Sequence, residues 1–137
     1  MALPIKIFID SSGFKAFIDP EDDFHLLADK ILKKLYLQKV NFITSNYIID
    51  ESATLVRCKS KPAVLKKFKE YVFSSRILNI NRVTRLDEAN AWVWFQKDWS
   101  RLSFTDCVSF AQLQRLGIKR VFGFDHHFEQ AGFILEK

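Results

Sequence analysis

Four acidic residues lie against or inside apolar stretches of the chain, where an uncompensated charge is costly to bury: Asp10, Glu51, Asp106 and Asp125. The first follows the apolar run 4–9 and the last follows the run 121–124, and both runs predict buried strands. Ligands of open α/β sheets bind just beyond the carboxyl ends of the strands, so two of these carboxylates would project into one crevice. Carboxylates gathered there would repel one another unless a cation or a proton compensates them.

A hard divalent cation is the natural compensator for such a group. Mg²⁺ and Mn²⁺ prefer oxygen ligands, keep several waters, and commonly bridge a few carboxylates to a phosphate. The chain as a whole is basic, with 21 Lys and Arg against 16 Asp and Glu and a formal net charge of +5. A basic surface around an acidic site suits a polyanionic substrate that is held for metal chemistry.

Each of the four acids also has an ordinary structural explanation. Glu51 could reach solvent from its helix or pair with Arg57 or a lysine. Asp106 stands three residues after Ser103, where a capping box places its acid. The two aspartates at strand ends could each cap the following helix. One such residue alone is weak support for a metal site, whereas four together favour it.

Strand-like and helical patterns alternate along the chain and must position these acids. We predict strands over residues 4–9, 42–44, 76–80, 119–122 and 133–135. We predict helices over residues 14–18, from near 21 to 35, 46–59, from 62 onward, 84–98 and 103–116. This alternation predicts an α/β fold, a three-layer sandwich whose central, mainly parallel sheet is flanked by helices. The length of 137 residues predicts a single domain over residues 1–137.

Cysteine usage and hydropathy indicate the compartment. Cys58 and Cys107 have neither the spacing of a zinc site nor that of a disulfide framework, which fits a reducing environment. The sequence begins without the features of a signal peptide. No apolar run approaches the roughly 20 residues that cross a bilayer. We therefore expect a cytoplasmic protein with no membrane association.

Four short motifs, in this order, resemble those of the PIN-domain nucleases, and most closely the small toxins of VapBC-type toxin–antitoxin pairs. The motifs are Phe8–Ser12, Thr44–Glu51, Leu102–Cys107 and Phe124–Phe128. The resemblance implies a PIN-like fold and an endoribonuclease that hydrolyses RNA phosphodiester bonds with Mg²⁺ or Mn²⁺. It matches the metal-binding and catalytic acids of that family to Asp10, Glu51, Asp106 and Asp125.

The resemblance also implies supporting residues and partners. Ser11 falls where a Ser or Thr hydroxyl often supports the site, and Ser103 supports the third acid through its capping box. The implied partners are an RNA substrate, a cognate antitoxin protein and a second copy of the chain in a homodimer. The alternative is a catalytically silent PIN-like scaffold that acts as an RNA- or protein-binding module. Haloacid-dehalogenase-like phosphatases are disfavoured, because they need a second aspartate where this chain has Ser12.

Basic residues are densest directly after the Glu51 helix. Arg57, Lys59 and Lys61 begin this group and are our candidates for contact with the RNA backbone. The alternative interpretation is an ordinary solvated helix face.

Two further clusters carry weaker predictions. Trp92, Phe95 and Trp99 have the spacing of one helical face, for which we expect core packing first and a protein or base contact second. His126 and His127 follow the fourth acid, but neighbouring residues point in different directions, so we expect neither to bind the metal.

Overall fold

The computed structural model describes residues 3–137, so the first two residues of the predicted domain lie outside the described part. Its strands are β1 (Ile5–Ile9), β2 (Val40–Ser45), β3 (Leu78–Asn81), β4 (Arg120–Phe122) and β5 (Ile134–Leu135). They form one sheet in the order β3-β2-β1-β4-β5, and all neighbouring strands are parallel. The predicted α/β fold with a parallel central sheet is therefore confirmed.

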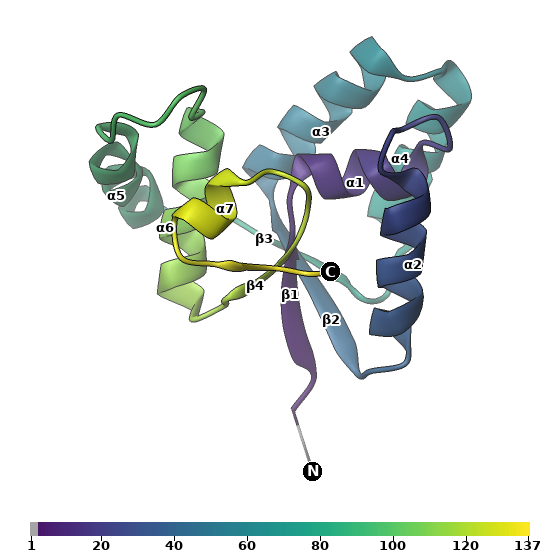
Figure 1. Cartoon of the computed structure of the whole chain (residues 1–137), viewed down its shortest axis with the longest axis horizontal. Helices are drawn as coiled ribbons and strands as arrows, with labels where there is room; N and C mark the ends of the chain where they lie inside the picture. The colour runs from purple at the N-terminus through teal and green to yellow at the C-terminus, as the bar shows by residue number, and fades with distance from the viewer. Residues whose placement is uncertain (1–2) are drawn as a thin grey trace.

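Helices follow the strands along the chain and cover the sheet. They are α1 (Ser11–Ile18), α2 (His25–Tyr36), α3 (Asn46–Lys59), α4 (Pro62–Ser74), α5 (Arg85–Phe95), α6 (Phe104–Leu116) and α7 (His127–Gln130). Figure 1 shows α1, α2 and α4 on the right of the strands and α5, α6 and α7 on the left. None of the helices in the described part of the chain is both long and apolar enough to cross a membrane.

Aromatic side chains fill the interior on both sides of the sheet. The largest fully buried side chains include Phe8, Phe14, Phe42, Phe110, Phe122 and Phe128. Three consecutive residues of β1, Ile7 to Ile9, have no exposed surface, as expected for a central parallel strand that is covered on both faces. This burial holds the end of β1, and therefore Asp10, at a fixed position in the sheet.

Helix α1 begins three residues earlier than predicted. Asp10 is its N-cap, and the Asp10 carboxylate accepts a hydrogen bond from the backbone N–H of Gly13. An N-cap side chain satisfies a backbone donor that has no partner within the helix, so the helix can start directly at Ser11. The predicted start of this helix at residue 14 was therefore wrong.

Helix α2 begins later than predicted, at His25 rather than near Glu21. The side chain of Asp19 accepts a hydrogen bond from the backbone N–H of Glu21, and that of Asp22 accepts one from Phe24. These local bonds hold residues 20–24 in turns, because they offer the backbone partners other than those of a helix.

The aromatic face predicted around α5 is divided in the structure. The helix ends at Phe95, not at residue 98. Trp99 therefore packs on Trp94, at a ring-centroid distance of 6.0 Å, and both rings contact the core. Trp92 and Phe95 pack against each other and Phe104, but Trp92 remains 56% exposed. Core packing was wrong for this exposed pair.

Candidate active site

The register of the sheet places two of the predicted acids near each other. Ile9 pairs with Phe122 at the ends of β1 and β4, so Asp10 lies beside Gly123. The contact is close, since a Cβ atom added to Gly123 would stand 2.1 Å from Asp10 Oδ1. Asp125 follows two residues later, at the same carboxyl edge of the sheet.

The Asp10 carboxylate is buried, with only 3% of the residue exposed. Its Oδ1 accepts hydrogen bonds from Gly13 N at 2.9 Å and from Ser12 Oγ at 2.8 Å. Burial raises the pKa of Asp10 to about 7, against the lowering effect of these hydrogen bonds. The charges of Asp125 and Asp106 raise it further, so these carboxylates lie close enough to influence Asp10.

Asp106 occupies the first turn of α6 and forms the predicted capping box. Its backbone N–H donates to Ser103 Oγ at 3.0 Å, and its carboxylate accepts from Ser103 N at 3.4 Å. Burial raises the pKa of Asp106 to about 7, and the charges of Asp125 and Glu51 add to the effect. Capping and membership of the acidic group thus coexist in one residue.

Glu51 reaches the group from α3. Ser45, the last residue of β2, caps this helix by accepting a hydrogen bond from Ile48 N. Glu51 then lies in the second turn, where its Oε1 accepts a 2.5 Å hydrogen bond from Ser11 Oγ. The predicted supporting hydroxyl is therefore in contact with the second of the predicted acids.

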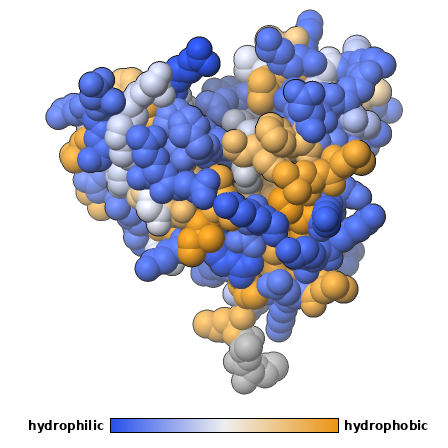
Figure 2. Space-filling view, viewed as in Figure 1, coloured by the Kyte–Doolittle hydropathy of each residue, from blue (hydrophilic) through white to orange (hydrophobic). Residues whose placement is uncertain are grey.

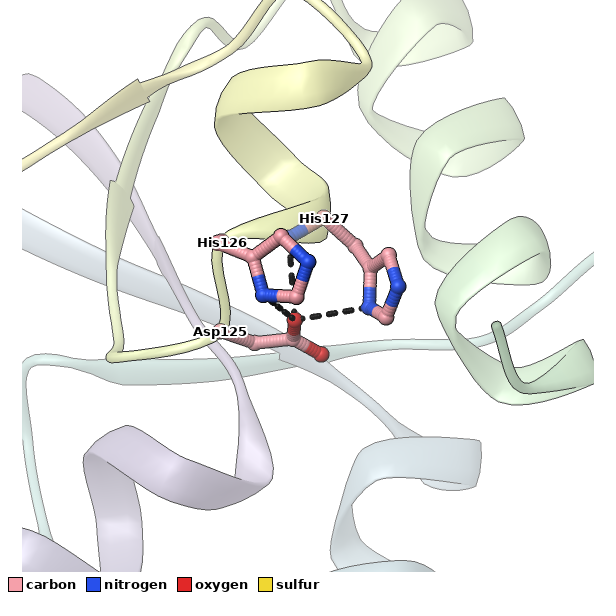
Figure 3. Close-up of side chains that lie close together, drawn as sticks. All are labelled: Asp125, His126 and His127. Carbon is pink, nitrogen blue, oxygen red and sulfur yellow. Dashed lines mark hydrogen bonds and ion pairs between the residues drawn. The ribbon is translucent and has the colours of Figure 1, made fainter. Parts of the chain in front are cut away.

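A buried histidine, which sequence reasoning set aside, joins two of the acids. His127 Nδ1 lies 2.8 Å from Asp125 Oδ1, a contact shown in Figure 3. The same nitrogen lies 3.7 Å from Asp106 Oδ2. Its other ring nitrogen, Nε2, is 2.8 Å from the carbonyl oxygen of Ser100, which can only accept. The Nδ1 contact has the distance of an ion pair without hydrogen-bond alignment, so this atom has no hydrogen-bond partner among the described residues. A buried, unpartnered nitrogen beside two carboxylates is a position that a cation or a proton would satisfy.

The neighbouring His126 lies in the same group. Ring centroids of His126 and His127 are 4.3 Å apart, and ligand atoms of both rings and of Asp125 lie within 4.8 Å of one another (Figure 3). The expected divergence of the two histidines is therefore not observed at the start of α7, where His126 is the N-cap and His127 the first helical residue. Whether either binds a metal stays a prediction.

No lysine or arginine of residues 3–137 forms an ion pair with any of the four candidate acids. The contrast is with two other buried aspartates. Asp19 pairs with Lys15, and Asp87 accepts two hydrogen bonds from Arg115 at 2.8 and 2.9 Å. Although burial raises the pKa of Asp19 and Asp87, hydrogen bonds and these cations bring both below the usual value. Asp10 and Asp106, which are also buried, thus differ from Asp19 and Asp87 in having no lysine or arginine partner among the described residues.

The predicted RNA-binding residues are not part of the acidic group. Arg57, Lys59 and Lys61 are exposed where α3 ends and α4 begins, and Lys61 pairs with Glu21 at 3.2 Å. At 1.5 Å per residue, Lys59 is about 12 Å along the helix from Glu51. They remain candidates for contacts with a bound polyanion away from the acids.

We predict that Gly123→Ala displaces the Asp10 carboxylate, because the added Cβ would lie 2.1 Å from its Oδ1 and 2.6 Å from its Cγ. Divalent-metal affinity, measured by titration with Mn²⁺, should fall by about tenfold or more, the usual effect of disturbing the support of a metal ligand. Gly123 gave no sequence signal beyond its position before the acid. Unchanged affinity would show that Asp10 can move without consequence.

This arrangement fits a hard cation. It offers carboxylate oxygens from the β1–α1 junction, from α3, from α6 and from the β4–α7 loop, with His127 beside two of the carboxylates. Oxygen-rich donor sets of this kind suit Mg²⁺ or Mn²⁺ better than metals that prefer sulfur.

The fold and this arrangement define a class of protein. The sequence model of the PIN domain family matches residues 7–134, so the chain belongs to the PIN domain family, as the motifs indicated.

Among characterised relatives, the chain is similar to the 23S rRNA-specific endonuclease VapC20 of Mycobacterium tuberculosis, from strains CDC 1551 / Oshkosh and ATCC 25618 / H37Rv. Both are 33% identical over 132 residues, which cover 93% of this chain and 95% of the relative. A crystal structure of Mycobacterium tuberculosis VapC20, described as a sarcin-ricin loop cleaving toxin, is similar with a TM-score of 0.83 and 27% identity. That similarity covers 93% of this chain and 96% of the other.

Proposed function

We propose that the chain is a single-domain endoribonuclease that depends on Mg²⁺ or Mn²⁺ and hydrolyses RNA phosphodiester bonds. The observation that carries the proposal is the acidic group at the carboxyl edge of the sheet, in which Asp10 and Asp106 are buried and for which residues 3–137 supply no lysine or arginine partner. A silent scaffold would have no reason to keep this destabilising group, because like charges in a buried site repel.

The roles of the residues follow from their positions. Asp10, Glu51, Asp106 and Asp125 would hold the cation, which supplies water activation and stabilises the leaving oxygen. Ser11 orients Glu51 through its 2.5 Å hydrogen bond, and the Ser103 capping box orients Asp106. The protein thus contributes fixed geometry and negative charge, not a covalent nucleophile.

For the substrate, we propose the RNA that the named relatives cut. Their names specify 23S rRNA and the sarcin-ricin loop, and similarity extends over 93% of this chain. We therefore propose that this chain cleaves the large ribosomal RNA and is the toxin of a type II toxin–antitoxin pair, acting in the cytoplasm. The net charge of +5 is consistent with a polyanionic target.

The proposal is tested by incubating the purified protein with intact ribosomes and with a panel of unrelated RNAs. Cleavage should require added Mg²⁺ or Mn²⁺, stop with EDTA, and disappear in Glu51→Gln, while primer extension should map the cut to one loop of the 23S rRNA. Cleavage that needs no metal, or that survives Glu51→Gln, would contradict the nuclease proposal. Cleavage of the panel without preference for 23S rRNA would contradict the substrate.

We predict that the basic residues after α3 strengthen RNA binding through phosphate contacts. The triple variant Arg57→Ala/Lys59→Ala/Lys61→Ala should bind RNA more weakly and show a less steep salt dependence, by about 0.7 per lost contact with a single strand. The measurement is binding affinity against salt concentration. A control with equal loss of charge on α2 should keep the salt slope: Lys30→Ala/Lys33→Ala/Lys34→Ala. Equal effects in both variants would indicate only a general charge effect.

We also propose a cognate antitoxin and a homodimer as partners. Apolar surface supports a protein partner, since Ile49, Leu65, Phe68 and Val72 line a hollow of about 520 Å³ between α3 and α4. A second hollow, of about 340 Å³, lies between α2 and the last residues, where Figure 2 shows apolar surface in orange. Surface of this kind commonly marks a protein interaction site. The mass of the protein in solution, with and without a co-expressed partner, tests both associations.

A further inference from the structure

The hydroxyl of Ser12 joins two strand ends that are far apart in the sequence. Ser12 Oγ lies 2.8 Å from Asp10 Oδ1 and 3.0 Å from Oδ2. The same oxygen accepts a hydrogen bond from the backbone N–H of Phe124 at 2.9 Å, across 112 positions. One side chain therefore connects the first acid to the residue directly before the fourth.

The chemistry of a hydroxyl makes this bridge directional. A serine has one proton to donate and lone pairs with which to accept. Because Phe124 N–H can only donate, it occupies a lone pair of Ser12 and leaves the proton for the Asp10 carboxylate. The bridge thus runs in one sense, from the β4–α7 loop through Ser12 to Asp10.

The remaining contacts of Asp10 determine which oxygen is available to a ligand. Oδ1 also accepts from Gly13 N and faces Gly123, where an added Cβ would stand 2.1 Å from Oδ1 but 3.0 Å from Oδ2. Oδ1 is therefore enclosed by the protein, and Oδ2 is the oxygen of Asp10 that has lone pairs available to bind a ligand. Ser12, within reach of both oxygens, limits rotation of the carboxylate about its bond.

We infer that Ser12 is a positioning residue for the metal site. It fixes the orientation of the Asp10 carboxylate and its spacing from Asp125, and so sets the affinity for a divalent cation. This inference rests on the proposed function, since it assumes that these two acids bind the metal. Groups that orient metal ligands commonly change metal affinity by roughly 10- to 100-fold when they are removed.

The test compares Ser12→Ala and Ser12→Thr with wild type, with Mn²⁺ as the probe and no RNA present. Ser60→Ala is the matched control, because Ser60 Oγ also donates to a buried carboxylate, Asp19 Oδ2 at 2.6 Å, outside the acidic group. Mn²⁺ affinity is measured by electron paramagnetic resonance, and melting temperature is measured without metal. Ser12→Ala should bind Mn²⁺ roughly 10- to 100-fold more weakly. Ser12→Thr, which keeps the hydroxyl, should recover most of this affinity, and Ser60→Ala should bind as wild type does.

Other outcomes separate the inference from the function on which it rests. If wild type binds Mn²⁺ and cleaves RNA while Ser12→Ala binds Mn²⁺ equally well, Ser12 has no positioning role, even if the variant melts at a lower temperature. If Ser12→Thr binds as weakly as Ser12→Ala, or if Ser60→Ala loses the same affinity, the hydroxyl bridge is not the cause. If wild type itself binds no Mn²⁺, the proposed nuclease function fails first.

Discussion

Replacing Asp10 by asparagine should abolish RNA cleavage and, at the same time, make the metal-free protein more stable. The loss of cleavage should exceed about 100-fold, because removal of a metal ligand should cost more than removal of a group that only supports one. The gain in the free energy of unfolding should be on the order of 2–4 kcal/mol at pH 8, where the buried wild-type carboxylate is ionised. Loss of function together with gain of stability distinguishes a functional acid from a structural one.

The opposite signs follow from the environment of Asp10. Burial raises the pKa of this residue to about 7, so its charged form is destabilised in the folded protein. Asparagine is as good an N-cap as aspartate, and its amide oxygen can still accept from Gly13 N and Ser12 Oγ. Its amide group would replace a negative charge near Asp106 and Asp125 with a hydrogen-bond donor.

Two measurements check this prediction, namely thermal unfolding without metal and the rate of RNA cleavage with Mg²⁺. Asp50→Asn is a suitable control, because Asp50 is the exposed neighbour of Glu51 on α3. It should change neither quantity appreciably, since surface substitutions are usually within about 0.5 kcal/mol. An Asp10→Asn protein that cleaves RNA at the wild-type rate would remove Asp10 from the site.

Stability of the metal-free protein should fall as the pH rises from about 4 to about 7. Asp10 and Asp106 have pKa values near 3.8 when unfolded and about 7 when folded. The folded state therefore holds more protons than the unfolded state within this interval, so the free energy of unfolding decreases with pH. One fully buried group with this shift accounts for up to roughly 4 kcal/mol. Asp19 and Asp87 act in the opposite sense, but their lowered pKa values confine the effect to pH below about 4.

A divalent cation should reverse this trend, because it binds the ionised carboxylates of the folded state. We expect saturating Mg²⁺ or Mn²⁺ to raise the melting temperature strongly at pH 8 and little at pH 5, with cleavage activity rising over the same interval. Denaturant unfolding at several pH values, with and without metal, measures the effect. In the Asp10→Asn/Asp106→Asn double variant, the free energy of unfolding without metal should hardly decrease between pH 4 and pH 7. A decrease as steep as that of wild type would show that other titratable groups cause it.

Much of the architecture could be predicted because it depends on local patterns. The apolar runs before Asp10 and Asp125 correctly predicted the strands β1 and β4, which end one and three residues before these acids, and the Ser103 capping box correctly marked the start of α6. The order of the motifs identified the family correctly, and with it the parallel sheet. These signals are local in sequence, and each survives folding because the tertiary structure agrees with the local preference.

The details that were missed depend on contacts between distant residues. His127 joins Asp125 to Asp106, and the bridge through Ser12 depends on the pairing of β1 with β4. Neither contact can be predicted from the local sequence, because the residues next to Ser12 or His127 do not indicate which distant residues these side chains will meet. The early start of α1 was missed for a related reason. Capping was considered only as the alternative to a metal-binding role for Asp10, whereas in the structure Asp10 caps α1 and also belongs to the acidic group.

The pairing of β1 with β4 also determines when the acidic group can be completed during synthesis of the protein. The ribosome makes Asp10 and Glu51 well before β4, the strand that leads to Asp125, and the Ser12 contact spans 112 positions. Parallel pairing over such separations is intrinsically slow, because the long intervening chain must be closed into a loop before the contacts form. A growing polypeptide therefore has an incomplete set of carboxylates until nearly the whole chain has been made. On the proposed function, the ribosome that translates it would meet an active nuclease only after that point.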